Sequence, residues 1–132
     1  GYLAYSITSI SGSSDYYVGS TVAYQNEIKI SQLGVSAETL ETYGAVSENT
    51  VKEMAIGARE KFGSDIGVAT TGLAGPTGGS EHLPVGTIWI GYSDKNQTIA
   101  KKLLLGSDRD INIKITAIAL LNFIRQTLGK ND

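Results

Sequence analysis

Three polar residues that lie close together early in the chain, Tyr24, Asn26 and Lys29, could carry proton-transfer chemistry. A lysine amine becomes a general base when burial lowers its pKa, and a nearby tyrosine hydroxyl can donate or relay a proton. We predict a β-rich stretch that runs into a short helix here, which would place the three side chains on one rim of a sheet. The spacing also fits a commoner arrangement, an exposed lysine beside an interface tyrosine.

A glycine-rich segment, Thr70–Ser80, contains four glycines and one proline directly after an expected strand. In open sheets, ligands bind at loops that follow strands, and glycines let backbone N–H groups approach an anion closely. The loop therefore favours a small phosphorylated ligand. It has neither the lysine of a Walker A loop nor the GxGxxG spacing. A long turn between two strands explains the same residues equally well.

Two further residues are candidates for a site. Arg109, in the first turn of an expected last helix, could bind phosphate or pair with Asp108 or Asp110. His82 is the single histidine and therefore a candidate base, but no serine or aspartate forms a recognisable triad with it. Because the chain has no cysteine and no clustered carboxylates, we expect no metal site.

The composition is that of one ordinary globular domain, and we expect residues 1–132 to form it. A hydrophobic fraction of 41% against 18% charged residues excludes the disordered class. The net charge of −2, with scattered basic residues, favours neither nucleic acid nor an anionic membrane as a partner. The most continuous apolar stretch, Ile115–Ile124, is too short to cross a bilayer. In the absence of a recognisable signal peptide, the default location is the cytoplasm.

Hydrophobic periodicity and capping residues predict an alternation of helices and strands. The expected helices are 1–10, Asn26–Leu33, Ser36–Tyr43, a helix capped by Ser47 and ended by Gly63, and Asp108–Leu128; the expected strands are Asp65–Thr71, Val85–Ser93 and Thr98–Leu105, after a β-rich stretch at Tyr16–Tyr24. The last two strands form a hairpin around Lys95-Asn96.

These elements predict an α/β fold, a three-layer α/β/α sandwich with a mixed sheet that includes one antiparallel hairpin and has helices on both faces. In the last helix an apolar stripe runs along one side, which is typical of a helix that packs by that side. The stripe consists of Ile111, Ile115, Ile118, Leu121 and Leu128. A helix that begins at the first residue has no cap for its first turn, so we expect a further segment, with a first strand, upstream of Gly1.

Seven motifs follow one another along nearly the whole chain. They are Gly12–Tyr17, Val22–Lys29, Gly44–Glu48, Met54-Ala55, Thr71–Gly79, Pro84–Thr87 and Gly106–Arg109. Together they resemble the CinA C-terminal domain family. The resemblance implies hydrolysis of the carboxamide of nicotinamide mononucleotide to nicotinate mononucleotide and ammonia, without metal or organic cofactor. It also implies homo-oligomers.

The same resemblance assigns roles to individual residues. Tyr24 and Lys29 match the catalytic positions, with Lys29 as base and proton shuttle and Tyr24 as its helper. The family's serine nucleophile belongs to a TAESCTGG-like motif whose last glycine aligns with Gly1, so the serine would lie upstream. Leu83 stands where many members have lysine, which removes one charge from the rim. The residues expected to bind the substrate are Asn26, Thr71, Gly72, Ala74, Gly75, Gly78, Gly79 and Arg109.

Two other classes of function remain open. One is a non-catalytic nucleotide-binding or regulatory module of a larger protein. The other is an assembly domain, in which the apolar positions of the hairpin and the last helix build an oligomer. The expected partners are thus a small pyridine nucleotide and further copies of the chain.

Overall fold

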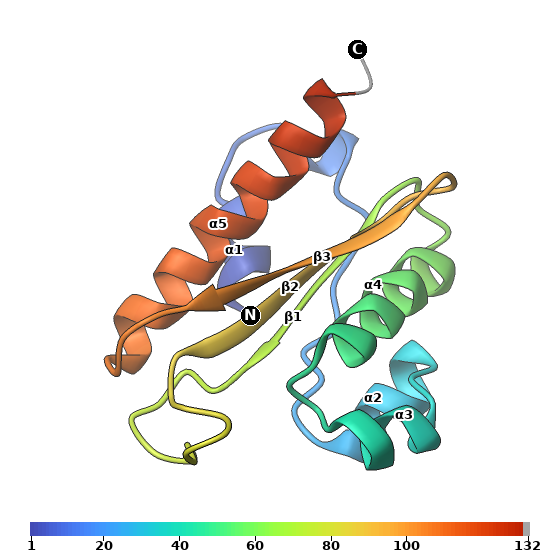
Figure 1. The fold of residues 1–132 in the computed structure, drawn as a ribbon. Helices are drawn as coiled ribbons and strands as arrows, with labels where there is room; N and C mark the ends of the chain where they lie inside the picture. The colour runs from blue at the N-terminus through green and yellow to red at the C-terminus, as the bar shows by residue number, and fades with distance from the viewer. Residues whose placement is uncertain (131–132) are drawn as a thin grey trace.

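Three strands form one sheet between two layers of helices in the computed structural model, which describes residues 1–130 (Figure 1). In chain order the elements are α1 (Tyr2–Thr8), the 3-10 helical turn η1 (Ser13–Asp15), α2 (Asn26–Leu33), α3 (Ala37–Tyr43), α4 (Glu48–Phe62), β1 (Gly67–Gly72), β2 (Thr87–Ser93), β3 (Thr98–Leu104) and α5 (Arg109–Gly129). The predicted elements are therefore present with boundaries that differ by no more than two residues, apart from the stretch before α2.

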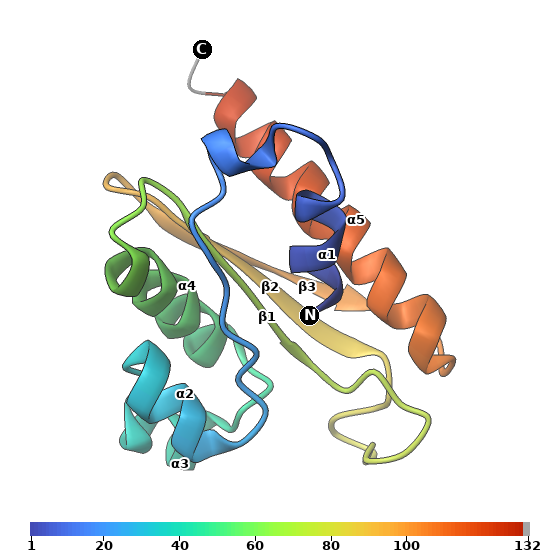
Figure 2. The same ribbon diagram turned by 180° about the vertical axis from the view of Figure 1, so that it is seen from behind.

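The sheet has the order β1-β2-β3, and both pairings are antiparallel. Helix α4, with α2 and α3 outside it, covers one face, while α1 and α5 cover the other (Figure 2). This arrangement confirms the α/β sandwich with helices on both faces. The mixed sheet is not confirmed, because neither of the two pairings within residues 1–130 is parallel. The expected strand at Tyr16–Tyr24 is irregular, since no neighbouring strand pairs with it in this part of the chain.

Strand β2 is the centre of the core because it is buried on both faces. Ile88 and Ile90 pack in a cluster with Leu120 of α5. Trp89, which points to the opposite face by the alternation of a strand, packs against the cluster that includes Met54 of α4. The sheet thus separates two apolar cores, and each core fixes one helical layer.

Local capping explains where the helices begin. The Ser47 hydroxyl accepts the backbone N–H of Thr50 at 3.2 Å, and α4 ends at Gly63 with a positive φ of 61°. At the start of α5, a carboxylate oxygen of Asp108 accepts the N–H of Ile111 at 3.0 Å. These caps are the reason that the helix boundaries could be predicted from sequence.

The apolar stripe of α5 lies on the solvent side, contrary to its expected packing role. Its five side chains are all exposed, with Ile118 at 63%. The buried side consists of Asn112, Thr116, Ala117, Leu120 and Thr127. Thr116 and Thr127 can be buried because each hydroxyl donates to the carbonyl four residues earlier, at 2.7 Å. The prediction from hydrophobic periodicity treated these threonines as polar and therefore placed the buried face on the wrong side of α5.

None of the helices within residues 1–130 combines the length and hydropathy that a membrane span requires.

Helix α2 packs on α4 at a distance that only glycine permits. A β-carbon at Gly57 would lie 1.7 Å from the backbone oxygen of Leu33. We expect Gly57→Ala to force the helices apart and lower the free energy of unfolding by about 1–3 kcal/mol, as overpacking does. Urea denaturation measures this. The matched control is Gly129→Ala, because Gly129 has no atom within 4 Å of such a β-carbon. Equal stabilities of the two variants would contradict the close packing.

Candidate active site

Lys29 is a buried lysine on α2, with 6% of its surface exposed. Its Nζ donates a hydrogen bond to the backbone oxygen of Tyr24 at 3.0 Å. No carboxylate forms an ion pair with it in the part of the chain that the structure describes. Desolvation by burial lowers the pKa of Lys29 below its ordinary value. A larger neutral fraction makes this amine a better proton acceptor near neutral pH.

Tyr24 connects Lys29 to the opposite layer of the sandwich. Its backbone oxygen holds the Lys29 amine, and its exposed phenol oxygen accepts a hydrogen bond from Nη2 of Arg109 at 2.6 Å. Tyr24 precedes α2, whereas Arg109 begins α5, so the contact joins segments 85 residues apart in the chain. The predicted lysine and arginine are therefore linked through Tyr24, Lys29 at its backbone oxygen and Arg109 at its phenol.

The first turn of α5 also holds the glycine-rich loop. Arg109 Nη1 donates to the backbone oxygen of Gly75 at 3.0 Å. Asn112, which is 1% exposed, donates from Nδ2 to the backbone oxygens of Ala74 and Gly106, both at 2.9 Å. Gly75 has a positive φ of 87°, and a β-carbon there would meet Val85 at 2.4 Å. The loop backbone at 74–75 is thus fixed by two side chains of one helix.

The sequence prediction did not single out Asn112. Its signal was its place three residues after Arg109, which puts both side chains on neighbouring positions of one helix face. Sequence alone could not assign Asn112 to the site, because its two partners, the backbone oxygens of Ala74 and Gly106, lie in loops whose positions depend on the fold.

The other predicted binding residues differ in their surroundings. Thr71 is buried, and its hydroxyl donates to the backbone oxygen of Ala45 at 2.7 Å, so it ties β1 to the segment before α4. Asn26 is exposed at the start of α2. Gly72 ends β1, while Gly78 and Gly79 lie in the exposed outer part of the loop. Their roles in binding a ligand stay predictions.

The charges at this site are mixed, because Arg109 lies between Asp108, whose carboxylate caps α5, and Asp110, which pairs with Lys114. Neither Lys29 nor Arg109 has a carboxylate within ion-pair distance among residues 1–130. Of the five N–H donors of the Arg109 guanidinium, two are used by Gly75 and Tyr24. The remaining donors of Arg109 favour an anionic ligand here, whereas the Asp108 carboxylate already occupies the N-terminus of α5. The same described residues contain no group of three metal-ligating side chains.

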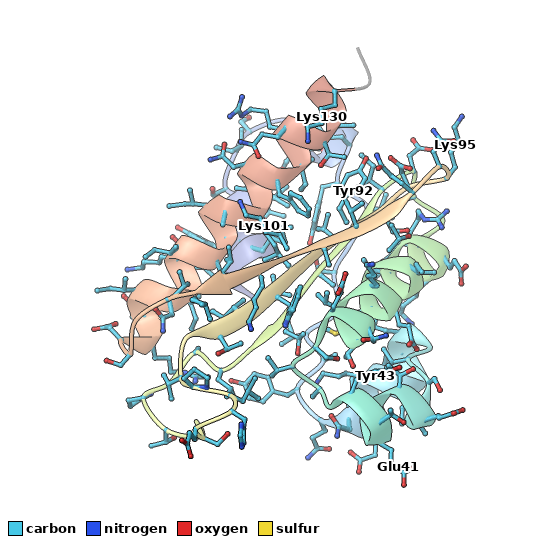
Figure 3. All side chains as sticks on the ribbon, viewed as in Figure 1. Glu41, Tyr43, Tyr92, Lys95, Lys101 and Lys130 are labelled. Atoms are coloured by element: carbon cyan, nitrogen blue, oxygen red, sulfur yellow. The ribbon has the colours of Figure 1, made fainter. Side chains whose placement is uncertain are left out.

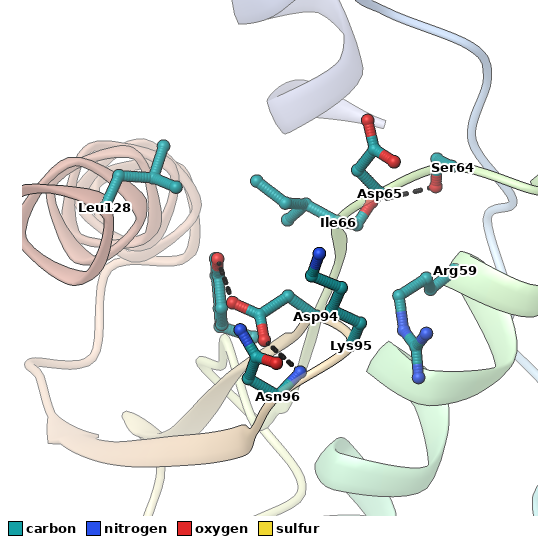
Figure 4. A pocket seen from close by; sticks show the side chains of 9 residues that line it. Arg59, Ser64, Asp65, Ile66, Asp94, Lys95, Asn96 and Leu128 are labelled. Carbon is teal, nitrogen blue, oxygen red and sulfur yellow. Dashed lines mark hydrogen bonds between the residues drawn. The ribbon is translucent and has the colours of Figure 1, made fainter. Parts of the chain in front are cut away.

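A cavity of about 370 Å³ lies elsewhere, at the hairpin end of the sheet (Figure 4). Its polar wall is built around the Tyr92 hydroxyl, which donates to Asp94 at 2.8 Å. Burial and this carboxylate raise the pKa of Tyr92 to about 12. Asp94 also accepts the backbone N–H groups of Asn96 and Gln97. Because these bonds build the turn between β2 and β3, we assign this cavity no part in the candidate site.

Residues 1–128 match the family model described as CinA C-terminal domain. This chain belongs to the CinA C-terminal domain family. Among curated relatives, a CinA-like protein of Cytophaga hutchinsonii is 56% identical over 128 residues, which cover 97% of this chain and 31% of that protein. A CinA-like protein of Amoebophilus asiaticus is 51% identical, again over 97% of this chain and 31% of its own length. The CinA domain thus spans about a third of these relatives.

Solved structures agree with this family. The competence damage-inducible protein A (ComA) of Klebsiella pneumoniae superposes with a TM-score of 0.93 at 32% identity, over 98% of this chain and 80% of that one. The competence/damage inducible protein CihA of Agrobacterium tumefaciens gives 0.88 at 37% identity, over 95% and 78%. This chain therefore has the same fold as solved proteins that are named competence/damage-inducible proteins.

Removal of the Asn112 amide should loosen the glycine loop. We expect Asn112→Ala to lower the free energy of unfolding by about 1–3 kcal/mol, because two carbonyls lose their partner in a buried place. Hydrogen exchange at the backbone N–H of Leu73 and Gly75 should also become faster. The control is Asn122→Ala on the exposed side of the same helix, which should change the stability by less than about 0.5 kcal/mol. If both variants behave alike, Asn112 does not anchor the loop.

Burial of Lys29 should give a pH-dependent stability. The pKa of Lys29 is lowered in the folded chain, whereas the unfolded chain has the ordinary value of 10.5. Between these values the unfolded state binds more protons, so stability rises with pH in that window. We therefore expect Lys29→Met to be more stable than the original chain near pH 7, with an advantage that shrinks as pH approaches 10.5. Urea titrations of both chains across this range measure the difference. A constant difference would show an unshifted lysine.

Proposed function

We propose that this domain acts in the hydrolysis of the carboxamide of nicotinamide mononucleotide, which gives nicotinate mononucleotide and ammonia. One observation carries the proposal: a buried lysine with a lowered pKa is joined through Tyr24 to an arginine that holds the glycine-rich loop. The competence and damage names of the relatives specify no reaction. The proposal therefore rests on the chemistry of the site and on the family resemblance of its motifs.

The ligand's phosphate is assigned to the loop side of the site. The three remaining N–H donors of Arg109 can bind phosphate oxygens. With Arg109 fixed on Gly75 and Tyr24, a phosphate bound there would place the rest of the nucleotide near Tyr24. This geometry supports a nucleotide rather than a free amide as the substrate.

Lys29 is assigned the proton transfers. In the proposed reaction a serine hydroxyl adds to the carboxamide carbon, and its proton passes to the Lys29 amine. The lysine returns a proton to the departing nitrogen, which leaves as ammonia. Water then cleaves the acyl ester and yields the carboxylate. We assign the role of nucleophile to the serine that the family resemblance implies upstream of Gly1.

The second candidate is a non-catalytic module that binds the nucleotide. It is favoured by the same observation, that the described residues bring a base and an anion site together without a serine at the base. Binding of the nucleotide is common to both functions, whereas ammonia release belongs to the first alone.

The test is ammonia release from nicotinamide mononucleotide by the complete product of the gene, measured beside the 132-residue chain. We expect Lys29→Ala to lower kcat by about 10²–10⁴, the contribution of a general base. The control is Lys52→Ala on α4, whose side chain pairs with Glu48 and should leave kcat unchanged. A complete protein that binds the nucleotide but releases no ammonia would favour the binding module. Absence of binding would exclude both functions for this ligand.

Arg109 can be tested separately through the phosphate. We expect Arg109→Ala to raise KM for nicotinamide mononucleotide by about tenfold to a hundredfold, because a charge-assisted hydrogen bond is worth about 1.5–3 kcal/mol. With nicotinamide riboside, which lacks the phosphate, the variant and the original protein should differ much less. An equal rise in KM for both compounds would contradict phosphate binding by Arg109.

A further inference from the structure

Strand β3 forms an open edge of the sheet. The strand order is β1-β2-β3, so one side of β3 pairs with β2, and the other side has no neighbouring strand within residues 1–130. The seven residues Thr98–Leu104 form a regular strand that contains neither proline nor glycine. An edge of this kind has a row of backbone N–H and C=O groups that can pair with a further extended segment.

The register with β2 shows which backbone groups of β3 face outward. At one end of the hairpin the N–H of Asp94 donates to Gln97 at 2.9 Å, and at the other the N–H of Leu105 donates to Gly86 at 2.8 Å. Bonded and non-bonded pairs alternate along an antiparallel ladder, so the odd-numbered residues of β3 bond to β2. The outward N–H and C=O groups are therefore those of Thr98, Ala100, Lys102 and Leu104, and none of them bonds to a loop or helix backbone in residues 1–130.

Two lysines stand near the centre of this edge, one on each face of the sheet. Lys101 is opposite Ile90 in the register and therefore lies on the α5 side. Lys102 is opposite Trp89 and lies on the α4 side. Both lysines are exposed, and neither has a carboxylate within ion-pair distance among the described residues. Lys130 at the end of α5 adds a further positive charge on the Lys101 side (Figure 3).

A groove beside β3 on the α5 side can take an apolar side chain. It has a volume of about 270 Å³ and lies between Ile99 of β3 and Phe123 of α5. The amides of Gln97 and Gln126 also line it. Ile99 is on the same face as Lys101, two residues along the strand. A segment that pairs with β3 and has an acidic residue beside Lys101 therefore places the residue two positions away over this groove.

We propose that β3 binds an acidic, extended segment of a partner protein, which joins the sheet as a further antiparallel strand. The outward backbone groups of 98–104 bond to the segment, in the orientation that both existing pairings have. Two consecutive carboxylates pair with Lys102 and Lys101, because neighbouring residues of a strand point to opposite faces. The next residue but one is apolar and lies in the groove at Ile99. The recognised pattern is thus acidic, acidic, any residue, apolar.

The lysines favour this occupant over the alternatives. A second copy of the same edge would bring Lys101 and Lys102 against the lysines of the other copy, and like charges directly opposite each other destabilise a strand pair. A neutral segment would form the backbone bonds but leave both amines without an opposite charge. An acidic pair supplies that charge on both faces of the sheet.

Fluorescence anisotropy of labelled peptides with the 132-residue chain tests the proposal. The probe is Val-Ile-Glu-Glu-Thr-Val-Thr, in which the glutamates face Lys102 and Lys101 and the second valine faces Ile99. We expect saturable binding that becomes about threefold to tenfold weaker when both glutamates are replaced by glutamine. Added salt should reduce the difference between the two peptides. Absence of binding up to about 1 mM probe overturns the proposal.

N-methylated probes test the backbone pairing. In the proposed register the N–H of the threonine opposite Ala100 points toward β3, whereas the N–H of the glutamate opposite Lys101 points away from it. We expect N-methylation of that threonine to weaken binding about tenfold, and the same change at the glutamate, the matched control, to have little effect. Binding should also slow hydrogen exchange at the N–H of Ala100 and Lys102. Equal effects of the two methyl groups contradict strand addition.

Charge exchange on the protein tests the lysines. Lys101→Glu and Lys102→Glu should each weaken probe binding about fivefold, and the double variant should bind a probe with two lysines in place of the glutamates. Lys61→Glu is the control, because Lys61 bonds to Gln32 on α2, and it should leave binding unchanged. Circular dichroism verifies that the variants fold. Binding that ignores the charge changes overturns the proposal, and so does self-association of the original chain that competes with the probe, since a second copy is then the occupant.

Discussion

The first turn of α5 is the point at which distant parts of this chain are joined. Arg109 and Asn112 contact Tyr24, the loop backbone at Ala74 and Gly75, and the turn at Gly106. These segments come from both helical layers and from the end of the sheet. Three of these hydrogen bonds go to backbone oxygens that the fold removes from water and that would otherwise have no partner. Each of these loops therefore depends on the position of this one helix. Asp108 sets that placement, since its carboxylate caps the same turn.

The hydrogen bonds of α5 stabilise the fold, whereas the burial of the Lys29 amine lowers the free energy of unfolding. A lysine without an acidic partner is accommodated in a buried place by a lowered pKa and by hydrogen bonds to the amine. Here the close packing of α2 on α4 at Gly57, together with the bond to the Tyr24 oxygen, keeps the amine in place. Residues held against their own preference are common where a protein does chemistry. The position of Lys29 therefore depends on the packing of α2 against α4 as well as on its own hydrogen bond.

An apolar pattern predicts that the isoleucine side of α5 is buried and the threonine side exposed, and the structure shows the reverse. Toward the sheet, threonines fit a narrow space and satisfy their hydroxyls within the helix. Away from the sheet, branched apolar side chains remain in contact with water. One helix thus fixes the glycine loop at its first turn, packs on β2 through Leu120, and leaves an apolar face exposed.

The sequence by itself determined the elements and much of the candidate site. Caps at Ser47 and Asp108 and periodic apolar residues are local signals, so the helices and the hairpin could be predicted closely, and the CinA motifs pointed to Tyr24, Lys29 and Arg109. Only the tertiary structure decided that β1 pairs antiparallel with β2, which side of α5 is buried, and that Asn112 anchors the loop. Those properties depend on contacts between residues far apart in the chain, and the free energy of such contacts is set by the packing of the whole domain rather than by any local segment.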